Sequence, residues 1–196
     1  MPTVLTHALA ASAAARVYGG AGLPRRFWAW TCAVAMLPDL DVVGFPLGIR
    51  YGDALGHRGF THSFAFAALV GVLVAAWAFP ACRSRTGRAL LGLHFTLASA
   101  SHALLDALTD GGLGVALLSP FALDRYFFSV RPIRVSPIGA GFFSSRGLDV
   151  LASEALWVWT PAALCLLAGL ALNRRGTLAS LMAPVPDGAP ARRRHG

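Results

Sequence analysis

The sequence has little charge and no lysine. Only 13% of its 196 residues are charged, 56% are hydrophobic, and the mean hydropathy is +0.59. A soluble domain carries roughly one quarter charged residues, so this chain lacks the polar residues that a water-exposed globule of this size needs on its surface. We therefore predict an integral membrane protein, whose outside is covered by lipid.

Cysteine is scarce as well, and basic residues are not concentrated on one surface. The three cysteines, Cys32, Cys82 and Cys165, are isolated and form no CxxC pair, which argues against a disulfide scaffold and against a thiolate zinc site. All 17 basic residues are arginines, and they occur in short clusters between apolar runs. A nucleic-acid-binding protein gathers its basic residues on one polar face, so we expect no nucleic-acid partner despite a pI near 10.9.

Five apolar stretches predict an all-α protein, a polytopic membrane helix bundle with four to five transmembrane helices. Residues 63–81, 89–108 and 151–172 are close to the roughly 20 residues that a bilayer-spanning helix requires. Residues 3–18 and 24–37 are shorter and could be tilted or cross incompletely. Pro24 is suited to the start of the second stretch, and Pro38 is expected to stop it.

The chain is expected to form one domain and a tail. Residues 1–182 make a single membrane-embedded helical domain. The first apolar stretch has no basic region before it, so we expect it to remain in the mature protein and not to be a signal peptide. Residues 183–196 are rich in proline, glycine and arginine and are expected to be disordered. No feature of the sequence defines an oligomeric state.

If the predicted helices alternate in direction across the membrane, the segments that connect them fall into an arginine-rich group on one side and a group of mixed charge on the other. One side collects 11 arginines and a single carboxylate, Asp187, and the other collects six arginines and eight carboxylates. The positive-inside rule makes the arginine-rich side cytoplasmic. We therefore expect a multi-pass protein of a bacterial-type inner (plasma) membrane, with a cytoplasmic C-terminus and with residues 38–61 and 109–150 on the extracytoplasmic face.

Ionisable side chains gather at the extracytoplasmic end of the predicted helices. Such groups are costly near lipid unless they are paired or coordinated, and their convergence on one face predicts a polar metal site there. On one helix His102 and Asp106 are one turn apart and project from the same face. The candidate metal ligands are His7, Asp39, Asp41, His57, His62, His102 and Asp106.

Two of these ligands are expected to come from an extended segment. Asp39 and Asp41 are two residues apart, so both would point the same way in an extended chain and could bridge two ions. Imidazole and carboxylate together suit zinc, with manganese or iron as alternatives, and not an all-oxygen calcium cage. The ligands exceed what one tetrahedral ion can use, so we expect two divalent ions, an arrangement that suits hydrolysis of phosphate esters.

The predicted function is therefore a membrane-bound, metal-dependent hydrolase of a phosphate ester in a lipid or lipid-linked substrate. Asp110 is a candidate further ligand, orienting residue or general base. Arg58, beside His57, is a candidate for holding a phosphate oxygen. Arg125, Arg131 and Arg134 are candidates for the same role, although a headgroup anchor or an ion pair with an aspartate suits each of them equally well.

Other functions fit the same residues. A non-catalytic metal-binding regulator or scaffold needs the same ligands, and a metal-dependent acyl-ester or amide hydrolase differs only in its substrate. A transporter is disfavoured because few polar residues lie at mid-membrane depth. Among these, His94 is interpreted as a hydrogen-bonding contact between helices and not as a ligand.

Several motifs together resemble one protein family. These are TH at residues 6–7, LPDLD at 37–41, HRGFTHS at 57–63, SHALLD at 101–106 with TDGG after it, SPF at 119–121 and RPIRVSPIG at 131–139. They are similar to the YdjM/YbcI-type family of inner-membrane-associated proteins described as metal-dependent hydrolases. The resemblance implies a helical membrane protein whose hydrolase site is built from these histidines and aspartates. The ligand spacing is also distantly similar to zinc phospholipase C and P1-type nucleases.

Overall fold

The computed structural model describes residues 1–19 and 22–172, and this part of the chain is helical without any strand. The α-helices are α1 (Val4–Gly19), α2 (Arg25–Met36), α3 (Phe64–Trp77), α4 (Arg85–Ala107), α5 (Ser145–Glu154) and α6 (Thr160–Leu172). Short 3₁₀ helices are η1 (Leu37–Leu47), η2 (Phe60–His62) and η3 (Gly139–Phe142), and η4 (Ala155–Trp159) is a π-helical segment. The predicted all-α class is confirmed. The tail predicted for residues 183–196 lies outside the described residues.

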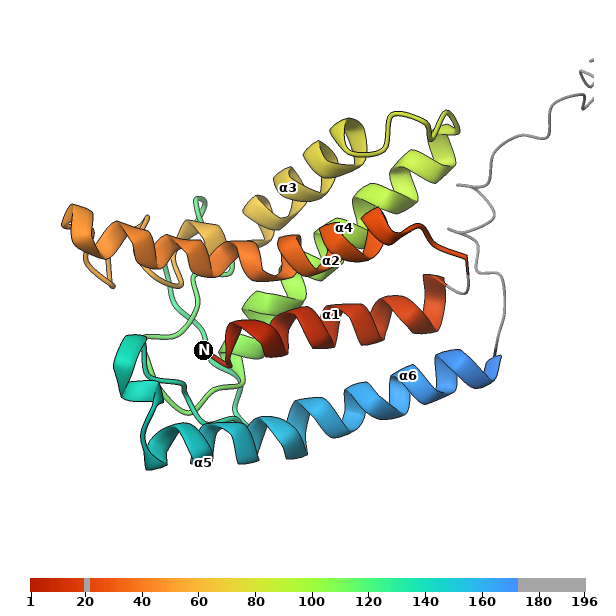
Figure 1. Ribbon diagram of the computed structural model, residues 1–196. Coiled ribbons are helices and arrows are strands. Elements are labelled where there is room, and N and C mark those ends of the chain that lie inside the picture. Colours follow the sequence, from red (N-terminus) through yellow and green to blue (C-terminus); the bar gives the residue numbers. More distant parts are fainter. Residues whose placement is uncertain (20–21, 173–196) are drawn as a thin grey trace, which may run out of the picture.

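The helices pass back and forth along one bundle (Figure 1). Helix α1 packs against α2 and α6, α2 packs against α4, and α3 packs against α4. The end of α1, the start of α2 and the α3–α4 connection lie at one end of the bundle, whereas the long segments 48–59 and 108–144 lie at the other. This alternation of the helix ends is the one that the sequence predicted.

Two helical segments of the described chain, not four to five, are long and apolar enough to cross a membrane by length and composition. The first is Arg25–Leu47, in which α2 continues directly into η1, and the second is Ser145–Ala171, in which α5, η4 and α6 follow one another. The remaining apolar helices are shorter or more polar. Helix α3, for example, extends over only 14 residues.

The α-helix ends where Pro38 was expected to stop it, because α2 finishes at Met36, but the chain continues directly into the 3₁₀ helix η1. Leu37 keeps right-handed helical angles (φ −55°, ψ −41°), and Pro38 takes a place in the first turn of η1. A proline there loses no hydrogen bond, because the first N–H groups of a helix have no partner inside it. Helix η1 ends at Gly48, whose φ of +84° is left-handed and suits glycine. The continuation carries Asp39 and Asp41 on a helix and not on an extended segment.

Candidate metal centre

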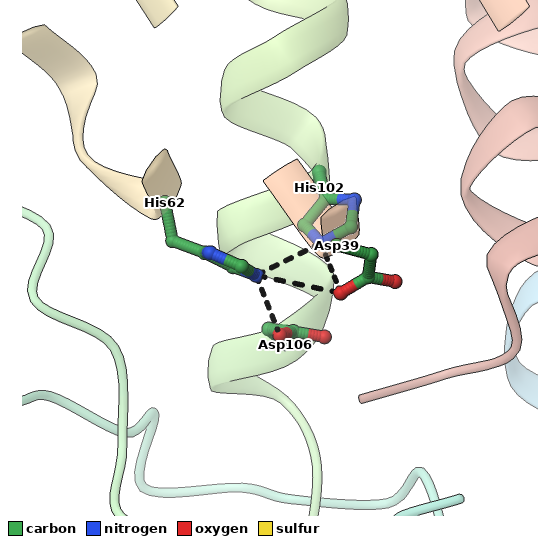
Figure 2. A group of neighbouring side chains, drawn as sticks. All are labelled: Asp39, His62, His102 and Asp106. Carbon is green, nitrogen blue, oxygen red and sulfur yellow. Dashed lines mark hydrogen bonds and ion pairs between the residues drawn. The ribbon is translucent and has the colours of Figure 1, made fainter. Parts of the chain in front are cut away.

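Four buried side chains from three elements meet at the end of the bundle where the long connecting segments lie (Figure 2). Asp39 comes from η1, His62 from η2, and His102 and Asp106 from successive turns of α4. Each offers one ligand atom, and these atoms all lie within 4.8 Å of one another. The helical spacing of His102 and Asp106 thus places both on the face of α4 that looks toward η1 and η2, as predicted.

The separations between the ligand atoms fit a tetrahedral ion. The Nε2 atoms of His62 and His102 are 3.1 Å apart. Asp39 Oδ1 lies 3.2 Å from His102 Nε2 and 3.6 Å from His62 Nε2, and Asp106 Oδ2 lies 3.4 Å from His62 Nε2. Ligand bonds of about 2.0–2.1 Å at tetrahedral angles give ligand-to-ligand distances of about 3.3–3.4 Å. These four separations are therefore close to those of a zinc-type site, and all four ligand atoms lie within 4.8 Å of one another.

Both imidazoles are held with Nε2 toward the centre. His102 Nδ1 donates to the carbonyl oxygen of Ala35 at 2.7 Å, and its Nε2 lies 3.2 Å from Asp39 Oδ1. His62 directs Nδ1 to Asp41 Oδ2 at 3.2 Å and Nε2 to the centre. A carbonyl or carboxylate behind the ring is the arrangement that fixes the tautomer of metal-binding histidines.

The carboxylates at the centre are buried without hydrogen-bond donors. Within the part of the chain that the structure describes, no hydrogen bond reaches either oxygen of Asp39 or of Asp106. The charge of Asp106 is balanced by ion pairs with His7, His62 and Arg58, and Arg58 Nε lies 3.0 Å from Oδ2. Desolvating a carboxylate without donors is strongly unfavourable, and a cation bound between the oxygens would remove this penalty. The donor chemistry and the orphaned oxygens together fit a divalent metal ion.

The protonation of His62 responds to the carboxylates around it. Burial acts to lower its pKa, but contacts with Asp106, Asp39 and Asp41 outweigh burial and raise the pKa to about 10. In the metal-free protein His62 is therefore an imidazolium at neutral pH. Because an imidazolium has no free lone pair on the ring, metal binding must displace this proton.

Asp41 lies next to the centre but faces away from it. In a 3₁₀ helix, residues two apart point about 120° apart, so the expectation that Asp39 and Asp41 point the same way is wrong. Asp41 Oδ1 accepts from His57 Nδ1 at 2.7 Å, and Oδ2 accepts from the Thr61 hydroxyl at 2.8 Å. Asp41, His57 and His62 form a second buried group that could hold an ion, but here the Asp41 oxygens already have protein donors.

The predicted substrate-binding arginines are mostly engaged with the protein. Arg58 is fully buried and has a left-handed φ of +64°, which is rare for a residue with a side chain. Its NH1 and NH2 groups donate to Gly111 O and Thr109 Oγ1. Arg125 donates to the carbonyl oxygens of His57, Tyr51 and Asp53. Arg131 is exposed and lies over the Phe127 ring.

Asp110 is not part of the buried group. It accepts hydrogen bonds from the Val135 amide and from Arg134. Burial acts to raise its pKa, but these two donors outweigh burial and lower it. With Arg134, Arg146 and Asp149 it lines an open cleft of about 430 Å³ at the start of α5. The structure thus places the predicted general base and one predicted substrate-binding arginine in a surface cleft, not among the metal ligands.

His7 does reach the buried group, from α1. Its ring stacks on that of His102 with 3.6 Å between the centroids, and its Nε2 lies 3.6 Å from Asp106 Oδ1. The side chain is fully buried, and neither ring nitrogen has a hydrogen-bond partner. Six of the predicted ligands therefore lie in two adjoining groups around His62, and His7 lies against Asp106.

One buried carboxylate was missed by the sequence reasoning. Glu154, at the end of α5, is fully buried and accepts from the hydroxyls of Thr3 and Thr6 and from the Thr3 amide. These hydrogen bonds connect Thr3 and Thr6, which lie just before His7 at the start of α1, to the α5–α6 segment. The signal was available, since Glu154 is an ionisable residue inside the apolar stretch 151–172.

The interpretation of His94 as a hydrogen-bonding contact between helices is confirmed. Thr31 donates its hydroxyl to Phe27 O and so accepts from His94 Nε2 at 2.8 Å, while Tyr18 OH lies 2.5 Å from Nδ1. Both ring nitrogens are thus used by neighbouring helices α1 and α2.

The fold and the buried cluster together define an all-helical membrane protein with a candidate metal centre. A family model described as YdjM inner membrane protein matches residues 1–176. The chain is also 39% identical over 166 residues to the inner membrane protein YbcI of Escherichia coli (strain K12). The aligned region covers 84% of this chain and 94% of that protein. The chain therefore belongs to the YdjM family of inner membrane proteins, the family that its motifs indicated. No solved structure matches it.

Proposed function

We propose that this protein is a membrane-bound, metal-dependent hydrolase of a phosphate ester in a lipid or lipid-linked substrate. The observation that carries the proposal is the meeting of Asp39, His62, His102 and Asp106, with their ligand atoms at tetrahedral spacing and with both carboxylates lacking hydrogen-bond donors. A divalent ion bound there would supply Lewis-acid chemistry and would lower the pKa of a water molecule. Zinc is the first choice of metal and manganese the second, with two ions in the full site.

The chain's own residues define the rest of the proposed chemistry. Arg58 balances the charge of Asp106, and Asp41 orients His57 and His62. Arg134, which is paired with Asp110, and Arg146 line the open cleft beside the end of α4 and suit a phosphate group. In the reaction, water would attack phosphorus, the ester P–O bond would break, and the departing alcohol would take up a proton.

The first test measures metal in the purified protein. We expect the wild type in detergent to retain stoichiometric zinc after dialysis, and His102→Ala to lose most of it, because a ligand is removed from a buried site. His94→Ala is the matched control, since it removes a buried histidine from the same helix that contacts Tyr18 and Thr31 instead. Wild-type protein without metal, or equal metal in His102→Ala, would overturn the proposal.

The second test separates the proposed activity from its alternatives. Zinc-loaded and chelator-treated protein are assayed on vesicles containing a phosphatidic-acid-type phosphomonoester and on vesicles containing a fluorogenic acyl ester. Zinc-dependent phosphate release supports the proposal, and zinc-dependent acyl cleavage supports the acyl-ester alternative. Bound zinc without turnover of either substrate supports a non-catalytic regulator or scaffold.

A further inference from the structure

A tetrahedral ion bound by the four-ligand group would have no free coordination position. A tetrahedral ion held by Asp39, His62, His102 and Asp106 has four protein ligands, and zinc sites of that kind are closed, whereas catalytic zinc sites keep a position for water or substrate. If the proposed function is correct, the reacting water and phosphate therefore need another place to bind. The two groups that adjoin this ion are the one around Asp41 and the one around His7.

The Asp41 side is poorly suited to a second ion. Both Asp41 oxygens already accept hydrogen bonds, from His57 on one side and from Thr61 on the other, and the Arg58 amide adds a third donor at 3.3 Å. His62, the only member shared with the first group, would have to bind one ion through each nitrogen. An ion at this place would displace donors that are already present.

On the His7 side, in contrast, the possible ligand atoms have no hydrogen-bond partners among the described residues. His7 is fully buried and both of its nitrogens lack partners, as do Asp106 Oδ1 and the second oxygen of Asp39. Nε2 of His7 lies 3.6 Å from Asp106 Oδ1, while Asp106 Oδ2 faces His62. In Figure 2 the second oxygens of Asp39 and Asp106 lie on the side of the helix that carries His7. His7 Nε2 and Asp106 Oδ1 are thus two unsatisfied ligand atoms that face each other across 3.6 Å.

Two histidine rings of the cluster stack on each other. The rings of His7 and His102 are 3.6 Å apart and within 14° of parallel, and each directs Nε2 toward a carboxylate of the cluster. Ions bound at these two Nε2 atoms would therefore lie in neighbouring positions of one cluster. Paired ions that share a bridging carboxylate in hydrolases lie about 3.5–4 Å apart.

We propose that His7 and Asp106 Oδ1 hold a second divalent ion, bridged by Asp106 to the four-ligand ion, and that this second ion is the one that binds the substrate. This inference rests on the proposed function. With only His7 and the bridging Asp106 as its protein ligands, the second ion would have coordination positions left for a phosphoryl oxygen and for water. The first ion then has a structural and charge-balancing role.

Metal counting on the zinc-reconstituted protein tests the inference. We expect about two zinc ions per chain in the wild type and in the His94→Ala control, and about one in His7→Ala. His7→Cys should restore the second ion, because a thiolate is also a zinc ligand. The zinc that His7→Ala retains shows that this variant has folded. One ion in both wild type and His7→Ala, or two in both, overturns the inference but leaves the proposed function standing, whereas a wild type without zinc overturns both.

Manganese gives a second readout that needs no variant and no activity. Two Mn²⁺ ions at this separation share a carboxylate and are magnetically coupled, so we expect a coupled electron paramagnetic resonance spectrum once more than one equivalent of Mn²⁺ is bound. The spectrum of isolated Mn²⁺ at full loading would contradict the inference.

Discussion

At the scale of single residues, the two aspartates of LPDLD have different tasks. Asp39 faces the centre with both oxygens free of hydrogen bonds, whereas Asp41 accepts from His57 and Thr61 and lies 3.2 Å from His62 Nδ1. A carboxylate behind a ligand histidine fixes the orientation of the ring and increases its basicity. Asp41 is thus a positioning residue for His62.

Replacing Asp41 tests this division of tasks. We expect Asp41→Asn to weaken zinc binding by about 10–100-fold without abolishing it, the usual effect of losing an outer carboxylate. Competition with a chelator of known affinity measures the change. Asp53→Asn is the control, because Asp53 is paired with Arg50 at the surface and its loss should not alter binding. Unchanged affinity would refute the role, and a loss as complete as that of His102→Ala would make Asp41 a ligand.

The site residues could be named from the sequence, but their grouping could not. Seven ligand candidates followed from the cost of ionisable groups near lipid, and the structure brings all seven to one end of the bundle. Which of them share an ion depends on rotations that the sequence does not reveal. Asp41 turns away because η1 is a 3₁₀ helix, and Arg58 turns inward because its backbone is left-handed. Periodicity gives no signal for either feature.

At the scale of elements, the α3–α4 pair depends on one glycine. A Cβ at Gly71 would lie 2.2 Å from Thr96 Oγ1 and 2.6 Å from the carbonyl oxygen of Gly92, too close for any side chain. Gly92, on the facing helix, has more room, since its nearest neighbour would be Ala75 Cβ at 3.8 Å. Close approach of these helices helps to hold α4, which carries His102 and Asp106, in its place.

A matched pair of alanine variants tests this contact. We expect Gly71→Ala to lower the free energy of unfolding by about 1–3 kcal/mol, because the helices must separate to admit the methyl group. Gly92→Ala should be neutral or stabilising, since alanine favours a helix by about 1 kcal/mol over glycine. Thermal unfolding in detergent measures both. Equal stability of the two variants would show that α3 and α4 are not constrained at Gly71.

Helix positions were predictable to within a few residues, and helix continuations were not. The apolar stretches 3–18 and 89–108 correspond to α1 (Val4–Gly19) and α4 (Arg85–Ala107). The sequence did not reveal that the 3₁₀ helix η1 would follow α2 without a break, because a proline is equally compatible with a helix end and with the first turn of a new helix. That continuation is what carries Asp39 to the centre.

At the scale of the whole molecule, charge and chemistry are separated along the bundle. The elements that carry the buried cluster, η1, η2 and the end of α4, lie toward the end with the long connecting segments, and the arginine-containing α3–α4 connection lies at the opposite end (Figure 1). The positive-inside rule therefore still favours a cytoplasmic arginine-rich end and an extracytoplasmic site. An extracytoplasmic site would act on substrates in the outer leaflet of the inner membrane.

Cysteine labelling tests the orientation. Phe143 is 89% exposed in the segment before α5, and Arg83 is exposed between α3 and α4. We expect Phe143→Cys to react with a membrane-impermeant maleimide in intact spheroplasts, and Arg83→Cys to react only after lysis, because the two residues lie at opposite ends of the bundle. Labelling of the wild type gives the background from Cys32, Cys82 and Cys165. The reverse pattern would place the metal centre on the cytoplasmic face, where it would meet soluble and inner-leaflet phosphate esters instead.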